Sequence, residues 1–122
     1  MDFNLGKEFE RISVQNHDNI CVIISKNETY NYSELNNLSN QFCNYFKSIK
    51  LKKNEIITIE SEKNIYTYAM IVACLKYGLV YCFINTSEAN KRRKQILKKI
   101  NSKFFFIFKK KNILDSIFVS TK

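Results

Sequence analysis

Few side chains in this sequence have the type and spacing that acid–base chemistry needs, and the clearest are two glutamates. Glu60 and Glu62 are two positions apart, so a strand would place both carboxylates on one face of a sheet. In such a pair one carboxyl can donate a proton while the other accepts one. Both residues stand where a predicted strand ends, and a solvated turn is the interpretation that we favour.

A run of basic residues is the second candidate, and its chemistry would be phosphate binding. The segment NKRRKQILKK, residues 90–99, is predicted to be a helix in which Lys91, Arg92, Lys94, Lys98 and Lys99 could contact the phosphates of a nucleic acid. No aromatic residues are interleaved to stack on bases. We therefore favour a solvated helix face over a nucleic-acid site.

The cysteines and the single histidine do not indicate a metal site or a nucleophile. No two cysteines form a C-x-x-C pair, and each lies in an apolar run, which is typical of reduced core residues: Cys21, Cys43, Cys74 and Cys82. His17 is far from any of them and lies outside the predicted sheet. We expect no metal, no disulfide framework and no catalytic base.

Composition limits the class of protein. A chain of 122 residues with 45% apolar residues is long enough for one core. The net charge of +9 allows acidic partners, but Lys, Asn, Ile and Phe are all abundant, as AT-rich codons would produce, so a lysine-rich solvated surface is the simpler interpretation. The N-terminus has an acid at Asp2 and no long apolar region, so we expect no signal peptide and a cytoplasmic location.

One apolar stretch, residues 65–84, is about as long as a membrane span. Lys76 lies inside it, and a lysine there would cost about 2.5–3.5 kcal/mol on insertion. The residues before Gly78 favour a helix and those after it favour a strand, and a glycine can adopt the left-handed conformation that ends a helix. We therefore predict a buried helix capped by Asn64 and then a buried strand, and keep the span as the alternative.

The helix before this stretch has the clearest pattern in the chain. Asn31 is the predicted N-cap, and Glu34 completes a capping box. The buried face is predicted to comprise Leu35, Leu38, Phe42, Phe46 and Ile49. The solvent-facing side is predicted to comprise Asn36, Asn37, Asn40, Asn44 and Lys47.

The remaining patterns complete an α/β fold. An N-terminal helical face is formed by Phe3, Leu5, Phe9 and Ile12, and a hairpin is predicted from residues 21–25 and the stretch KNETYNY. Further strands are predicted at residues 55–61, 79–84 and 103–108, and Ser87 is the predicted cap of the basic helix, in which Ala89, Ile96, Leu97 and Ile100 face inward. The predicted fold class is an N-terminal hairpin followed by α-β-α-β-α-β, with a mainly parallel sheet covered by helices. We treat residues 1–122 as a single partial domain, with no element assigned to residues 109–122.

Parallel sheets bind ligands at the carboxyl ends of their strands. Here those ends supply Glu60, Ser61, Asn85, Thr86 and Lys109, without a G-x-G-x-x-G or Walker loop.

Several stretches, in order, resemble the N-terminal part of adenylate-forming ligases, the superfamily of AMP-dependent synthetases, acyl-CoA synthetases, luciferases and nonribosomal peptide synthetase adenylation domains. ETYNYSELNNLSNQFCNYF is similar to the family's LTYAELNERANRLARYL, and LKYGLVYCFINTS is similar to LKAGAAYVPLDPS. EANKRRKQIL parallels YPAERLAYML, with Arg92 on the family's arginine, and SKFFFI parallels AKVLLT. The departures are Asn54–Glu55 in place of Gly-Asp, and the missing prolines, which shape turns in the family.

The resemblance implies ATP and Mg as the family's cofactors, held by a Ser/Thr/Gly-rich loop ending in Pro-Lys, a ribose-binding Asp and a C-terminal Lys. No stretch here resembles these motifs, and VSTK at residues 119–122 lacks the glycines that let a backbone wrap phosphate. We therefore assign no catalytic, cofactor-binding or metal residues and expect no cofactor to be bound by this chain alone.

The function that follows is a scaffold segment of such a ligase, inactive alone, whose partner is the remaining part of a split enzyme or another protein that covers an exposed sheet edge. A standalone interaction module is the alternative, and a basic nucleic-acid-binding protein is the weaker one; we do not expect a membrane partner. If the chain is a split half, the nucleotide sequence beyond Lys122 should encode the missing motifs.

Overall fold

The structure is a computed structural model, and it describes residues 4–61, 63–85, 90–99, 104–108 and 117–120. The chain forms two compact units, each made from two separate stretches of sequence. One unit comprises residues 1–51 and 63–78, and the other comprises residues 52–62 and 79–122. Each unit is described by itself.

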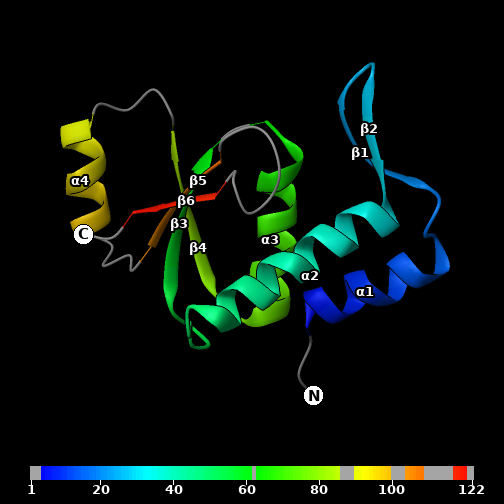
Figure 1. The fold of residues 1–122 in the computed structure, drawn as a ribbon, viewed down its shortest axis with the longest axis horizontal. Coiled ribbons are helices and arrows are strands. Elements are labelled where there is room, and N and C mark those ends of the chain that lie inside the picture. Colours follow the sequence, from blue (N-terminus) through cyan, green and yellow to red (C-terminus); the bar gives the residue numbers. More distant parts are fainter. Residues whose placement is uncertain (1–3, 62, 86–89, 100–103, 109–116, 121–122) are drawn as a thin grey trace. The chain divides into compact units, whose positions relative to one another are not determined.

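The first unit contains three helices and a hairpin. The helices are α1 (Leu5–Gln15), α2 (Tyr32–Ser48) and α3 (Ile65–Tyr77), and the hairpin pairs β1 (Ile20–Ser25) with β2 (Glu28–Asn31) in antiparallel fashion (Figure 1). No helix within the described ranges is long and apolar enough to cross a membrane. The stretch from residue 65 to residue 84 is therefore the predicted helix and strand.

The helix boundaries follow the predicted caps. The Asn31 side chain accepts from the Glu34 N–H at 2.8 Å, and the Glu34 carboxylate accepts from the Asn31 N–H at 3.0 Å, which is the predicted capping box. Asn64 accepts from the Thr67 N–H at 2.9 Å at the start of α3. Gly78 ends α3 with φ at 89°, in the left-handed conformation that the sequence predicted.

The predicted buried face of α2 is confirmed at three of its positions. Leu35, Phe42 and Phe46 are buried, whereas Leu38 and Ile49 are half-buried. Phe46 packs edge-to-face on Tyr77 of α3, with ring centroids 5.5 Å apart. The predicted apolar face of α1 is less buried than that of α2, because Leu5 is 54% exposed while Phe9 and Ile12 are half-buried. Phe3 lies outside the described residues.

The predicted solvent-facing side of α2 was wrong at two positions. Asn36 and Asn40 are half-buried, and each accepts a hydrogen bond from the Lys76 ammonium on α3, at 2.5 and 2.8 Å. The fully buried Ser39 hydroxyl accepts a third bond at 2.9 Å. Asn37, Asn44 and Lys47 are exposed as predicted. An apolar periodicity cannot reveal this polar contact, because both partners are polar residues on different helices.

Lys76 also lies beside α1. Its ammonium is 5.8 Å from the centre of the Phe9 ring and 3.9 Å from the Glu10 carboxylate, and its side chain is only 9% exposed. Burial lowers the pKa of the Lys76 ammonium, and the Glu10 carboxylate partly opposes this effect. Lys76 therefore connects all three helices of the first unit.

The second unit is built on a four-stranded sheet in the order β4-β3-β5-β6. It comprises β3 (Ile56–Ser61), β4 (Val80–Asn85), β5 (Phe104–Phe108) and β6 (Ile117–Ser120), together with helix α4 (Asn90–Lys99). Strand β3 pairs in parallel with both β4 and β5, which confirms the predicted parallel core. Ile57, Thr58 and Ile59 are fully buried, as expected for a central strand of a parallel sheet.

One strand was not expected. Residues 109–122 had no predicted element, yet β6 pairs antiparallel with β5 through that region, with Ile107 opposite Phe118. A four-residue strand at a sheet edge offers too short a pattern for recognition from sequence. The predicted inward side of α4 is described at one position, where Ile96 is half-buried; Ala89, Ile100 and the predicted cap Ser87 lie outside the described residues, as does the side chain of Leu97. That helices cover the sheet stays a prediction.

The turn before β3 explains how the family's Gly-Asp is replaced. Asn54 has a φ of 71°, in the left-handed region that asparagine tolerates better than most residues other than glycine. The Glu55 carboxylate accepts a hydrogen bond from the Lys52 N–H at 2.5 Å, across the same turn. Asn54 and Glu55 therefore form a tight turn here without a glycine.

Gly6→Ala should destabilise the protein. A Cβ at this position would lie 2.5 Å from both the Cα and the N of Lys76, and a backbone atom cannot move aside cheaply. In an exposed helix the same change would stabilise by up to about 1 kcal/mol, so we expect the opposite sign here, a loss of about 1–3 kcal/mol. Urea unfolding monitored by circular dichroism measures this change in the free energy of unfolding, with Lys7→Ala on the exposed side of α1 as the control. An increased midpoint would contradict the close packing of α1 on α3.

Lys76→Met should also destabilise the protein. The change keeps the apolar stem but removes the donor shared by Asn36, Ser39 and Asn40. An acceptor left buried without a donor costs about 1–3 kcal/mol, and Ser39 is fully buried. The control is Lys47→Met, an exposed position on α2, for which we expect a change within about 0.5 kcal/mol. Equal unfolding midpoints for the two variants would refute a stabilising role for the Lys76 contacts.

Candidate functional site

The carboxyl edge of the sheet was the first place expected to hold a ligand. The parallel register aligns Glu60 with Ile84 and Ser61 with Asn85, so the predicted strand ends do meet at one edge. Glu60 is half-buried. The other half of the predicted carboxylate pair, Glu62, lies outside the described residues, as do Thr86 and Lys109. The pair therefore stays a prediction.

Helix α4 carries the predicted basic residues. Lys91, Arg92, Lys98 and Lys99 are all exposed, as the solvated-face interpretation requires. The segment NKRRKQILKK is helical as predicted, over Asn90–Lys99, and the side chain of Lys94 lies outside the described residues. This exposure is consistent with a solvated surface. The helix sequence contains no aromatic residue that could stack on a base.

The prediction that the cysteines are core residues is confirmed only at Cys74. All four are free thiols; Cys74 is buried and Cys21, Cys43 and Cys82 are half-buried. Burial raises the pKa of the Cys21, Cys43 and Cys74 thiols, so the nucleophilic thiolate is disfavoured at each. Across the part of the chain that the structure describes, no three His, Cys, Asp or Glu side chains gather into a group that could hold a metal ion.

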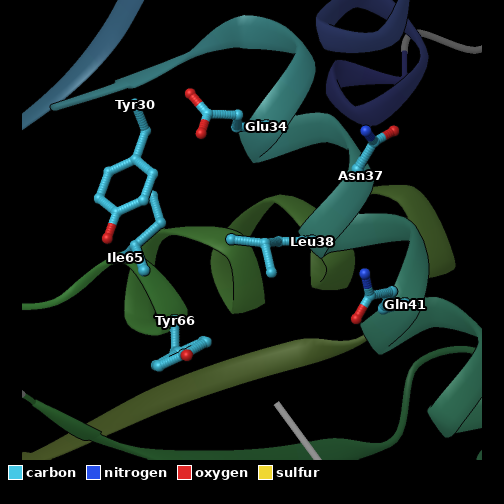
Figure 2. A pocket seen from close by; sticks show the side chains of 7 residues that line it. All are labelled: Tyr30, Glu34, Asn37, Leu38, Gln41, Ile65 and Tyr66. Atoms are coloured by element: carbon cyan, nitrogen blue, oxygen red, sulfur yellow. The ribbon is translucent and has the colours of Figure 1, made fainter. Parts of the chain in front are cut away.

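Sequence reasoning did not identify a hollow that the described residues of the first unit form. Its volume is about 350 Å³, at the small end of the range for ligand sites. Figure 2 shows the lining side chains coming from three elements. They are Tyr30 from β2, Glu34, Asn37, Leu38 and Gln41 from α2, and Ile65 and Tyr66 from α3.

Local structure positions these groups. The α2 residues are spaced by three and four, so they share one face of the helix, beside the buried face that was predicted. The capping box orients Glu34, and the Asn64 cap fixes the first turn of α3, from which Ile65 and Tyr66 project. The spacing of residues 34, 37, 38 and 41 was the signal in the sequence that could have indicated the hollow. Three of these four residues are polar, however, and the same pattern is typical of an ordinary solvated helix face.

The electrostatics of the hollow suit binding rather than proton transfer. The Tyr30 hydroxyl donates to the Glu28 carboxylate at 2.7 Å. This hydrogen bond, together with burial and the nearby charge of Glu28, raises the pKa of Tyr30 to about 12. The phenol therefore stays protonated at neutral pH, with its proton donated to Glu28, and it can offer a ligand an aromatic surface but not a base.

Comparisons with known proteins agree with the resemblance in the sequence. The family model of the AMP-binding enzyme matches residues 9–120. The bassianolide nonribosomal cyclodepsipeptide synthetase of Beauveria bassiana is 34% identical over 73 residues, which is 60% of this chain and 2% of the synthetase. Nonribosomal peptide synthetase 2 of Gibberella zeae is 29% identical over 84 residues, which is 69% of this chain and 2% of that protein.

A solved structure shows the same fold. The N-terminal subdomain of NpsA from Klebsiella oxytoca superposes with a TM-score of 0.75 at 20% identity, covering 84% of this chain and 26% of that one. The chain thus spans a small part of each of these proteins, and the match lies in the N-terminal part of adenylation domains. Since the family model covers nearly the whole sequence, this chain belongs to the AMP-binding enzyme family and is homologous to the N-terminal part of nonribosomal peptide synthetase adenylation domains.

Proposed function

We propose that this chain is the N-terminal scaffold segment of an AMP-dependent carboxylic or amino acid ligase and that it does not activate acids by itself. The family's reaction joins the carboxylate of an acid to the AMP moiety of ATP and releases pyrophosphate. That step needs donors placed on the developing pyrophosphate and two substrates held in line. The proposal depends on what this chain can supply toward those requirements.

The use of glycine is the observation that carries the proposal. A backbone that wraps a phosphate needs glycines, and this sequence has two. Gly6 lies against the backbone of Lys76, where a Cβ would clash, and Gly78 ends α3 in the left-handed conformation. Both glycines therefore have structural roles, and the chain has none for a phosphate loop.

ATP and Mg are the cofactors that the family implies, and the residues here do not fit them. The described residues contain no cluster of three metal-binding side chains, and the sequence contains no loop ending in Pro-Lys. We propose that both are bound by the part of the ligase that this sequence does not contain. We also propose a cytoplasmic location, where the four free thiols would stay reduced.

Strand β4 is where we propose that a partner attaches. Among the described strands it is hydrogen-bonded to β3 alone, so one of its edges has no strand beside it there. Two of its apolar side chains, Val80 and Phe83, are 46% and 44% exposed. An unpaired edge with apolar side chains favours addition of another strand. The remaining part of a split ligase is the partner that we favour.

The same edge supports the second candidate function, a standalone interaction module that retains the ligase fold. A nucleic-acid-binding role is the weaker alternative. It would rest on the exposed cations of α4, and we expect any such binding to be nonspecific and to weaken steeply with salt.

The purified chain should show no ATP–pyrophosphate exchange above background with a panel of amino, aryl and fatty acids. The reason is the missing phosphate loop and catalytic lysine. Exchange that depends on both ATP and an acid would contradict the proposal. Where the downstream gene sequence encodes the missing motifs, coexpression of that piece should restore exchange, and failure to do so would favour the interaction module.

The isolated chain should self-associate through the β4 edge. We expect multi-angle light scattering to show a mass that increases with concentration, and Phe83→Ser to reduce that increase because it removes an exposed apolar group from the edge. Val14→Ser is the matched control, since Val14 is 71% exposed on α1 and belongs to the helical unit rather than to the unit that contains β4. A monomer at all concentrations, or equal effects of the two variants, would count against the edge as a docking surface.

A further inference from the structure

The hollow between β2, α2 and α3 has a lining that suits one kind of ligand. Two tyrosines, Tyr30 and Tyr66, supply aromatic surfaces, and Leu38 and Ile65 supply an apolar base (Figure 2). The amide groups of Asn37 and Gln41 add hydrogen-bonding groups, and both side chains are exposed. The opening is thus apolar in its depth and polar at its rim.

The charge of the hollow is opposite to that of the protein. The chain carries a net charge of +9, yet Glu34 is the one lining side chain that is charged at neutral pH. A second carboxylate, Glu28, is held next to the hollow by the 2.7 Å hydrogen bond from Tyr30. Tyr30, Glu34 and Tyr66 line the same hollow, so the two carboxylates lie close to its aromatic rings. A local site for a cation therefore lies on a basic protein.

We propose that this hollow binds the guanidinium group of an arginine side chain presented by a partner protein. A guanidinium is planar, so it stacks on tyrosine rings, and its fork of N–H donors matches carboxylate and amide oxygens. The apolar base formed by Leu38 and Ile65 suits the three methylenes of the arginine stem. A lysine ammonium would use the charge but not the stacking.

The site is accessible as it stands. Glu34 is exposed, and Tyr30 and Tyr66 are half-buried. One Glu34 oxygen accepts from the Asn31 N–H at 3.0 Å, and a carboxylate has lone pairs for further donors. This binding site does not depend on the proposed ligase function, because it lies in the first unit and uses none of the missing motifs.

A titration followed by ¹H–¹⁵N correlation spectra tests the proposal, with the peptide acetyl-Gly-Arg-Gly-amide as the probe. The comparison peptide replaces arginine with citrulline, which has the same shape without the charge. We expect the arginine peptide to shift the amides of Tyr30, Glu34 and Tyr66 and to bind about tenfold more tightly than the citrulline peptide, since charged hydrogen bonds and cation–π contacts both contribute.

Two variants separate the contributions. Glu34→Gln removes the charge but keeps an acceptor for the capping box, so α2 retains its start. Tyr66→Leu removes one aromatic surface. We expect each to weaken binding of the arginine peptide about two- to fivefold. Asp18→Asn, an exposed residue outside the hollow, makes the same charge change as Glu34→Gln and should leave binding unchanged.

Three results would overturn the proposal. The first is equal affinity for the arginine and citrulline peptides. The second is an equal loss of binding in Asp18→Asn and Glu34→Gln, which would show a general charge effect. The third is a set of shifted amides that excludes the residues of the hollow.

Discussion

The ammonium group of Lys76 is the point on which the three-helix unit depends. Its side chain donates to α2 at positions 36, 39 and 40, so it fixes the helical register of α2 against α3. Its backbone lies against Gly6, which fixes α1 at the same residue. Neutral oxygens surround the charge at hydrogen-bonding distance, and the Glu10 carboxylate oxygen is 3.9 Å away. The one charged residue of α3 therefore orients both neighbouring helices.

Scarcity of glycine shapes both the fold and its function. With only two glycines available, the chain adopts positive φ at Lys50 and Asn54, where many proteins would use glycine. The turn before β3 is maintained because Asn54 tolerates that conformation and Glu55 closes the turn with its carboxylate. A backbone of this composition can form helices, strands and tight turns, but it lacks the successive glycines of a phosphate cradle.

Most of the fold could be predicted from the sequence because its signals are local. The caps at Asn31 and Asn64, the glycine at position 78 and the apolar runs of β3, β4 and β5 each depend on neighbouring residues. The contacts of Lys76 and the hollow could not be predicted, because each joins polar side chains from separate elements. From the sequence alone, a polar residue on a helix is assigned to the solvated face. Asn36 is half-buried and Asn37 is exposed only because of the way α2 packs against α3.

The division of each unit between two stretches of sequence has a consequence for vectorial synthesis on the ribosome. The helical unit has all its residues once Gly78 has emerged, whereas the sheet unit needs residues 79–122 as well as residues 52–62. Strand β3 therefore leaves the ribosome before either of its parallel neighbours exists, and it must wait while α3 is made. Ile57 and Ile59, which are fully buried in the folded chain, have no partner strand during that interval, and unpaired apolar strands of this kind are prone to aggregate.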